Sequence, residues 1–233
     1  VFAAISEDGY FIYSKDAGLT SESIKISSNE TVLTDVSLTD DGKSAAISES
    51  TGYLYLFDLY SGRIDKVSEI KDNWSSVYIS SDPERIVATD LYNFIYISNS
   101  IDNENISWEK KSYNCESYIK DLCCSKDLSL IYLIEVDGYI AYSNDFGNSF
   151  IKLQNIGIRY FRGVDCSADG ATVAAVISYD SIYISSDYAK SWKRNDNLDM
   201  NDWSSIKLSS DGKNQIATVE DGFVYISFDN GET

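Results

Sequence analysis

The sequence predicts an all-β fold: a β-propeller of six blades, each with four antiparallel strands, in a single domain over residues 1–233. One observation is a turn residue that recurs every 41 to 45 positions, at Gly9, Gly52, Asn93, Gly138, Ser181 and Gly222. A period of this length holds four short strands with their turns. The other is that runs such as FIYIS, SIYIS and FVYIS alternate with period two and are rich in aromatic and β-branched residues, which is typical of strands. No stretch has a convincing helical pattern. Seven blades are the alternative if the chain is part of a longer one.

Each copy of the repeat is predicted to hold a first strand, a turn, a second strand, an acidic turn, a tyrosine-rich third strand and a fourth strand. The first copy lacks its first strand, since FAAIS and YFIYS flank Asp8-Gly9, a dipeptide typical of a hairpin turn. The sixth copy ends at Thr233, before a fourth strand. Six copies of four strands, less these two, predict 22 strands. The later copies begin near Asp35, Trp74, Tyr118, Phe161 and Trp203.

Composition disfavours several classes of function. The net charge of −18 disfavours nucleic acid and anionic membranes as partners, because both attract the opposite sign. No run of 18 apolar residues occurs, so no membrane-spanning helix and no membrane insertion are predicted.

Metal and cofactor sites are not expected either. The chain has no histidine, which removes the commonest general base and the commonest zinc ligand. The four cysteines lack paired Cys-x-x-Cys spacing, so no zinc site is predicted. Cys123 and Cys166 fall at equivalent positions of successive copies and are predicted to be buried thiols, whereas a disulfide from Cys115 stays open.

Four segments at repeat spacing follow the pattern Ser-x-Asp-x-Gly-x-Ser/Thr, one of them with Ala189 in place of the glycine. The pattern comprises Ser14, Asp16, Gly18 and Thr20; Ser143, Asp145, Gly147, Ser149 and Phe150; Ser185, Asp187, Ser191 and Trp192; and Ser227, Asp229, Gly231 and Thr233. It resembles the Asp box, also called the BNR repeat, and the whole unit resembles the propeller repeats of sialidase-like and sortilin-like proteins. The resemblance covers nearly the whole chain and implies a propeller whose boxes lie on the rim, away from the ligand face.

The box residues are predicted to be structural. Glycine permits a turn with positive φ, which Ala189, in the glycine position of the third box, adopts only at a cost. The Asp and Ser or Thr side chains hydrogen-bond to local backbone groups and close the turn. The closing Phe150 or Trp192 fills the space between sheets as an apolar plug.

Sialidase activity is not expected. Sialidases bind a carboxylate with three arginines and use a Tyr/Glu nucleophile with an Asp acid. This chain has five arginines, of which Arg159 and Arg162 share one loop. Other glycosidases need two carboxylates roughly 5 to 10 Å apart across a cleft, and the sequence singles out no such pair. No catalytic residue is therefore assigned, and a glycoside hydrolase is kept only as an alternative.

The turn between the second and third strands carries at least one carboxylate in every copy. These residues are Glu7, Asp8, Glu49, Asp90, Glu135, Asp137, Asp180, Glu220 and Asp221. In a propeller these turns share one face, so they predict an acidic collar for a basic peptide, a cationic protein or a divalent cation such as calcium. The competing interpretation is that Asp and Glu simply form solvated turns.

Three aromatic residues, Trp74, Phe161 and Trp203, are predicted to lie in the connections between copies, each three positions before a first-strand aliphatic residue. If they are exposed beside carboxylates, they suit stacking on sugar rings, as in a lectin. Because they recur in register like core positions, they suit packing between adjacent blades better.

Together these patterns predict a non-catalytic binding or scaffold module that recognises a protein, with carbohydrate binding as the alternative. Asn-x-Ser/Thr triplets beginning at Asn29, Asn73 and Asn105 favour an extracellular or surface location. Val1 falls inside a repeat, so the chain is expected to be a processed product or part of a larger chain or assembly.

Overall fold

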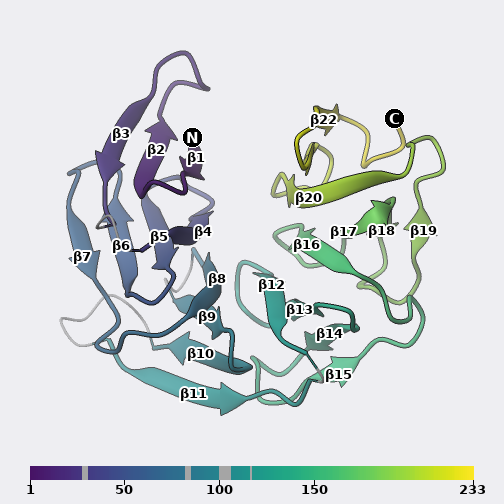
Figure 1. Cartoon of the computed structure of the whole chain (residues 1–233), viewed down its shortest axis with the longest axis horizontal. Coiled ribbons are helices and arrows are strands. Elements are labelled where there is room, and N and C mark those ends of the chain that lie inside the picture. The colour runs from purple at the N-terminus through teal and green to yellow at the C-terminus, as the bar shows by residue number, and fades with distance from the viewer. Residues whose placement is uncertain (28–30, 82–84, 100–105, 116) are drawn as a thin grey trace. The chain divides into compact units, whose positions relative to one another are not determined.

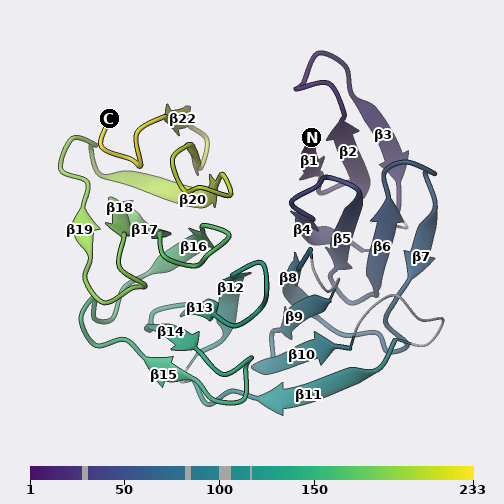
Figure 2. The same cartoon turned by 180° about the vertical axis from the view of Figure 1, so that it is seen from behind.

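Every regular element of the structure is a β-strand. The computed structural model describes residues 1–27, 31–81, 85–99, 106–115 and 117–233; within them 22 strands form antiparallel sheets and no helix occurs. The all-β prediction and the number of strands are thus confirmed for this part of the chain. The chain packs as two compact units, Val1–Ser112 and Tyr113–Thr233, which are described separately. Figure 1 labels the strands except β21, and Figure 2 shows them from behind.

The first unit holds three sheets of strands that are consecutive in sequence (Figure 1). Their strand orders are β1-β2-β3, β4-β5-β6-β7 and β11-β10-β9-β8. The bounds are β1 Phe2–Ile5, β2 Tyr10–Ser14, β3 Glu22–Lys25, β4 Leu33–Leu38, β5 Ser44–Glu49, β6 Leu54–Asp58, β7 Ile64–Lys66, β8 Trp74–Ile79, β9 Ile86–Asp90, β10 Phe94–Ser98 and β11 Trp108–Ser112.

The second unit begins with a four-stranded sheet, β12-β13-β14-β15, and continues with β16 to β22 in one seven-stranded sheet. The bounds are β12 Ile119–Cys124, β13 Ile131–Glu135, β14 Ile140–Ser143, β15 Ile151–Lys152, β16 Phe161–Cys166, β17 Val173–Asp180, β18 Ile182–Ser185, β19 Lys193–Arg194, β20 Asn201–Leu208, β21 Gln215–Val219 and β22 Val224–Ser227.

The strands divide among the six copies as the repeat predicts: three in the first copy, four in each of the next four, and three in the sixth. One strand pairing between copies was not predicted. The eight-residue β17 of the fifth copy also pairs with β20 of the sixth, with Ser178 opposite Asp202 and Asp180 opposite Asn201. The period sets the strands within a copy but carries no information on pairing between copies.

The core lies between successive copies within each unit. Between the first and second copies, the rings of Phe11, Tyr13 and Phe57 pack with centroids 5.1 to 5.4 Å apart. Second strands such as β9 and β13 are buried along their whole length. In the second unit Cys123 and Cys166 lie in one such apolar cluster as free thiols, which confirms their predicted burial. Cys115 is also a free thiol.

A β-bulge recurs near the start of the first strand in copies two to six. The register shifts lie at Leu33/Asp35, Trp74/Ser76, Ile119/Asp121, Phe161/Gly163 and Trp203/Ser205. Bulges re-aim side chains and increase local twist. In copies two, three and six, the hydroxyl of the bulged residue lies 2.8 to 2.9 Å from a hydroxyl of the second strand. These pairs are Thr34–Ser48, Ser75–Thr89 and Ser204–Thr218.

Carboxylates also link neighbouring first strands. Asp35 Oδ2 accepts the Val77 amide at 3.0 Å in the first unit. In the second unit Asp121 Oδ2 accepts the Val164 amide at 3.1 Å, and Asp165 Oδ2 accepts the Leu208 amide at 2.7 Å. Neighbouring first strands, between which the described residues show no strand pairing, are thereby joined by side chain-to-backbone bonds.

Candidate functional site

The acidic turns between second and third strands separate into exposed and buried carboxylates. Glu7 and Asp8 are exposed in the first unit, and Asp137, Glu220 and Asp221 are exposed in the second. Asp137 and Asp221 have φ near 50°, a left-handed conformation that aspartate tolerates better than most residues. These side chains are available to solvent and to a charged partner.

Glu49, Asp90 and Glu135 are 5%, 0% and 1% exposed. Each is the last residue of a second strand, and its side chain is directed back towards its own copy. Asp90 Oδ1 accepts the amides of Tyr92 and Phe94 at 2.8 and 2.9 Å, which closes the turn. These three carboxylates stabilise turns from the inside and do not present charge to a partner.

Tyrosine hydroxyls complete the bonding of these buried carboxylates. Glu49 accepts the Tyr55 hydroxyl at 3.0 Å. Burial, followed by the bond to Glu49, raises the pKa of Tyr55. Such a tyrosine is held neutral as a hydrogen-bond donor.

Glu135 has both a tyrosine and a lysine as partners. Its Oε1 accepts the Tyr113 hydroxyl at 2.5 Å and lies 3.0 Å from Lys152 Nζ. Burial first, and then Glu135, raise the pKa of Tyr113. The pair resembles a Tyr–Glu catalytic arrangement in composition, but both groups are buried, so a substrate cannot reach them without rearrangement.

Asp72 and Asp90 share one donor. The Tyr96 hydroxyl lies 2.8 Å from Asp72 Oδ2 and 3.2 Å from Asp90 Oδ2. Burial raises the pKa of Asp90, and the charge of Asp72 adds to the shift. Because Asp90 is fully buried and Tyr96 is 3% exposed, these carboxylates do not flank an open cleft as glycosidase residues must.

Asp180 is partly exposed and ion-paired. Its Oδ1 lies 3.0 Å from Arg194 Nε, and its Oδ2 accepts the Tyr183 hydroxyl at 3.1 Å. Glu220 pairs with Arg162 at 2.7 Å. The remaining arginines bond locally: Arg63 to Asp65, Arg85 to the Ser98 carbonyl and Arg159 to the Ile158 carbonyl.

The three aromatic candidates lie within first strands. Trp74, Phe161 and Trp203 belong to β8, β16 and β20 and are 2%, 0% and 0% exposed. The Trp74 indole donates to the Gly52 carbonyl at 3.0 Å, and that of Trp203 to the Asp180 carbonyl at 3.3 Å. The prediction placed these residues in connections; the bulged start of each first strand instead turns the ring into the core. They offer no exposed surface for stacking on a sugar.

Four loops share one hydrogen-bond pattern and are called here the Ser-Asp loops: residues 14–20, 143–149, 185–191 and 227–233. In the second loop, Ser143 Oγ donates to Asp145 at 2.7 Å and accepts the Gly147 amide at 2.8 Å. The amide and hydroxyl of Ser149 both donate to Asp145, at 2.9 and 2.7 Å. The other three loops repeat these bonds.

The backbone of these loops turns left-handed at two successive residues. Gly18, Gly147 and Gly231 have φ between 76° and 88°, and Ala189 takes the same place at 61°, as predicted for the glycine position. The preceding residues, Ala17, Phe146, Tyr188 and Asn230, also have φ between 59° and 62°. This second position was not predicted, because its residues, Ala, Phe, Tyr and Asn, include no glycine and follow no single pattern.

The Ser-Asp loops predict a pH dependence of stability. The hydroxyl four residues later is the largest cause that lowers the pKa of Asp16, Asp145, Asp187 and Asp229 from 3.8 to about 2. Because the folded-state pKa is depressed, the contribution to stability is complete above about pH 4 and is lost as the pH falls to 2. We expect the melting temperature of the unchanged chain to fall more over this interval than that of the double variant Asp145→Asn/Asp187→Asn, since asparagine does not titrate. Its Oδ1 still accepts the bonds made to the aspartate Oδ1, whereas its amide nitrogen can only donate to the later serine hydroxyl.

A double variant at two exposed aspartates outside the loops, Asp199→Asn/Asp221→Asn, is the matched control and should follow the unchanged chain. Equal slopes for the loop variant and the control between pH 4 and 2 would contradict the assignment.

Asparagines after the fourth strand bind the next Ser-Asp loop, a role that sequence reasoning missed. Asn155 Nδ2 donates to the Ala189 and Lys190 carbonyls at 3.0 and 2.8 Å. Asn197 Nδ2 donates to the Glu232 carbonyl at 2.9 Å. Asn155 and Asn197 are one period apart in the sequence, so their spacing could have predicted that they have a shared role.

The aromatic residues that close two of the loops pack against other side chains of the second unit. Phe150 meets Tyr113 edge to face with centroids 5.6 Å apart, and Trp192 packs against the cluster between the fourth and fifth copies. Of the three Asn-x-Ser/Thr triplets, Asn29 and Asn105 lie outside the described residues. Asn73 Nδ2 donates to the Tyr92 hydroxyl at 3.0 Å.

In the described ranges no group of three or more Cys, Asp or Glu residues is placed to hold a metal ion. The same part of the chain has no helix of the length and apolarity needed to cross a membrane. No protein-family model and no curated protein matched the chain.

Proposed function

We propose that this chain is a β-propeller of Asp-box-type repeats that acts as a non-catalytic binding module for a cationic protein or peptide, through its exposed acidic turns. The observation that carries the proposal is the division of the turn carboxylates. Those with internal roles are buried and bonded, whereas Glu7, Asp8, Asp137 and Asp221 project into solvent. The net charge of −18 adds a long-range attraction for cations.

The burial and bonding of the inner carboxylates support a binding role over a catalytic one. Glu49, Asp90 and Glu135 are buried and have tyrosine, lysine or backbone partners. Trp74 and Trp203 are packed in the core, which removes the surface on which the carbohydrate alternative depended. The exposed turns remain the best-supported surface for recognition.

The experiment compares two triple variants of equal charge. Asp8→Asn, Asp137→Asn and Asp221→Asn neutralise the exposed turns, and Asp40→Asn, Glu109→Gln and Glu232→Gln neutralise exposed acids elsewhere. The probe is a fluorescent decalysine peptide, followed by anisotropy at low and high salt. We expect the turn variant to bind about five- to tenfold more weakly at low salt, because local charges act within a Debye length.

The control variant should lose less than about twofold. Equal losses in the two variants would show that only the total charge matters, and would overturn the assignment of the turns. Circular dichroism of each variant checks that the fold is intact.

A further inference from the structure

A cavity lies between the fourth and fifth copies, within the second unit. Its volume is about 420 Å³, in the range of roughly 300 to 1,000 Å³ that is usual for small-ligand pockets. The fourth copy contributes Tyr142, Leu153 and Asn155 to the wall. The Ser-Asp loop 185–191 of the fifth copy contributes Tyr188 and Lys190. Figure 1 shows these copies, β12–β15 and β16–β19, next to each other. Both copies have all four of their strands, so the cavity belongs to a complete contact between copies.

The wall on the side of the fourth copy carries a pair of tyrosines that the repeat does not require. Tyr132 of β13 and Tyr142 of β14 lie opposite each other, with ring centroids 6.4 Å apart. At the same register of the second copy, Ala46 lies opposite Leu56. Because an aliphatic pair completes the same strand pairing there, the two rings are a feature of this copy and not of the fold.

The wall on the side of the fifth copy places a third ring at the cavity. Tyr188 and Ala189 have φ of 62° and 61°, a left-handed conformation that bulky residues rarely adopt. Ala189 is buried in the cluster between the copies, whereas Tyr188 is 47% exposed. Ala17 holds the position of Tyr188 in the first Ser-Asp loop, with φ of 61°, so the loop geometry does not require an aromatic side chain.

The charge of the wall separates the classes of ligand. Of the described residues that line the cavity, none is Asp or Glu, although the chain has 37 of these. Lys190 is the charged residue of the wall, and its Nζ lies 5.7 Å from the centroid of the Tyr188 ring. A cationic ligand therefore has no ionic partner in the wall, and the net charge of −18 opposes an anionic ligand at long range. A neutral ligand fits both conditions.

Two asparagines of the wall supply hydrogen-bonding groups. Asn155 Nδ2 donates to two backbone carbonyls of the fifth copy, at 3.0 and 2.8 Å. Since carbonyls only accept, these bonds fix the orientation of the amide and leave its Oδ1 as an acceptor. Asn144 also lines the cavity and is exposed. With the Lys190 ammonium, the wall offers donors and an acceptor, which suits hydroxyl groups that both donate and accept.

We propose that this cavity binds one neutral pyranose unit of a saccharide. The apolar C–H face of the sugar ring packs against Tyr142 and Tyr188, and its hydroxyls bond to Asn144, Lys190 and Asn155 Oδ1. An aromatic side chain of a partner protein would fill the same space but would leave these polar groups without partners, which disfavours it.

This site is separate from the acidic turns. Its residues lie where β13 begins and β14 ends, at the opposite end of these strands from the turn of Asp137. It is also separate from Trp74, Phe161 and Trp203, which the sequence suggested for stacking on sugars and which are buried. A sugar site here therefore adds to the proposed recognition of a cationic partner.

The test titrates maltose, lactose and cellobiose, three neutral disaccharides, into the ¹⁵N-labelled full chain. We expect saturable NMR shifts with at least one of them, at millimolar affinity. The shifted amides should be those of the cavity wall, in segments 129–132, 142–144, 153–155 and 188–190.

Two variants introduce residues that other copies have at the same positions, so the fold should be kept. Tyr142→Leu follows Leu56 of the second copy, and Tyr188→Ala follows Ala17 of the first. Each should bind the sugar about fivefold more weakly, because each removes apolar contact area. Asn144→Ala should weaken binding by about threefold through loss of a hydrogen bond.

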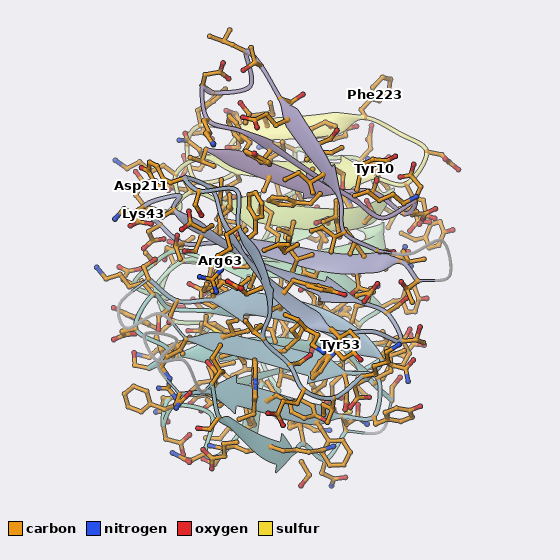
Figure 3. The ribbon with its side chains drawn as sticks, turned by 90° about the vertical axis from the view of Figure 1, so that its left-hand side faces the viewer. Tyr10, Lys43, Tyr53, Arg63, Asp211 and Phe223 are labelled. Carbon is orange, nitrogen blue, oxygen red and sulfur yellow. The ribbon has the colours of Figure 1, made fainter. Side chains whose placement is uncertain are left out.

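Three controls test other surfaces. Phe146→Ala removes the ring at the equivalent position of the preceding Ser-Asp loop. Phe223→Ala removes an exposed ring that Figure 3 shows extending away from the ribbon. The turn variant Asp8→Asn/Asp137→Asn/Asp221→Asn removes the acidic turns. All three should keep the affinity for the sugar within about twofold, as expected of distant sites, so failure of the acidic-turn proposal does not affect this one.

Absence of saturable shifts with all three disaccharides would overturn the proposal. Shifts that persist unchanged in both Tyr142→Leu and Tyr188→Ala would do the same, since the sugar would then bind elsewhere. Glucosamine and glucuronate, compared with glucose, test the charge of the ligand, and tighter binding of either charged sugar would contradict the assignment to a neutral one.

Discussion

Replacing Trp203 with alanine is expected to lower the free energy of unfolding by about 3 to 5 kcal/mol, the usual cost of truncating a large buried aromatic side chain. The ring is fully buried, packs against Tyr225 and belongs to the cluster between the fifth and sixth copies. The substitution also leaves the Asp180 carbonyl without its indole donor. Guanidinium unfolding followed by circular dichroism measures the change.

Phe228→Ala is the matched control, since Phe228 is 75% exposed and its loss should change stability by less than about 0.5 kcal/mol. If Trp203→Ala were as mild as this control, Trp203 would not be a core residue, and its role in ligand recognition would have to be considered again.

Replacing Lys152 with methionine is expected to cost about 3 kcal/mol, because it leaves the buried Glu135 carboxylate without its cation. This value is at the lower end of the usual range, since Lys152 is itself 27% exposed. Lys152 also lies over the rings of Tyr113 and Tyr139. Chemical unfolding at neutral pH measures the loss.

A second substitution identifies the cause. Glu135→Gln in the Lys152→Met background removes the uncompensated charge and should recover more than half of the loss. If the double variant were no more stable than Lys152→Met, packing of the lysine stem would account for the effect, and the ion pair would not.

The sequence predicted the strands well because strand and turn signals are local. Each signal lies within about ten residues: a turn residue, an alternating run such as YFIYS or FVYIS, or the Ser-x-Asp pattern. The 22 strands and the four equivalent loops appear where these signals predicted them. Pairing between copies, as in β17 with β20, depends on contacts that no local pattern encodes. Closure of the sheets into a six-bladed propeller stays a prediction.

The acidic turns show where such reasoning fails. Glu49 is the last residue of β5, three positions before Gly52, whereas Glu220 lies one position beyond β21 (Gln215–Val219) and two positions before Gly222. Glu49 is buried because Tyr55 and Tyr53 bond to it, whereas Glu220 is exposed and pairs with Arg162 of another strand. Burial depends on which donor lies across the sheet or in the neighbouring copy, so the sequence could identify the carboxylates but could not separate structural ones from exposed ones.

The carboxylates that join neighbouring first strands bear on how the chain unfolds. Asp121 and Asp165 each bond to the backbone of the next copy, so the fourth, fifth and sixth copies form a series in which each is coupled to the one after it. In repeat proteins, stability is the sum of such nearest-neighbour couplings and of the intrinsic stability of each repeat. Weakening a single link in such a series divides one cooperative transition into two, and the copies beyond that link melt first.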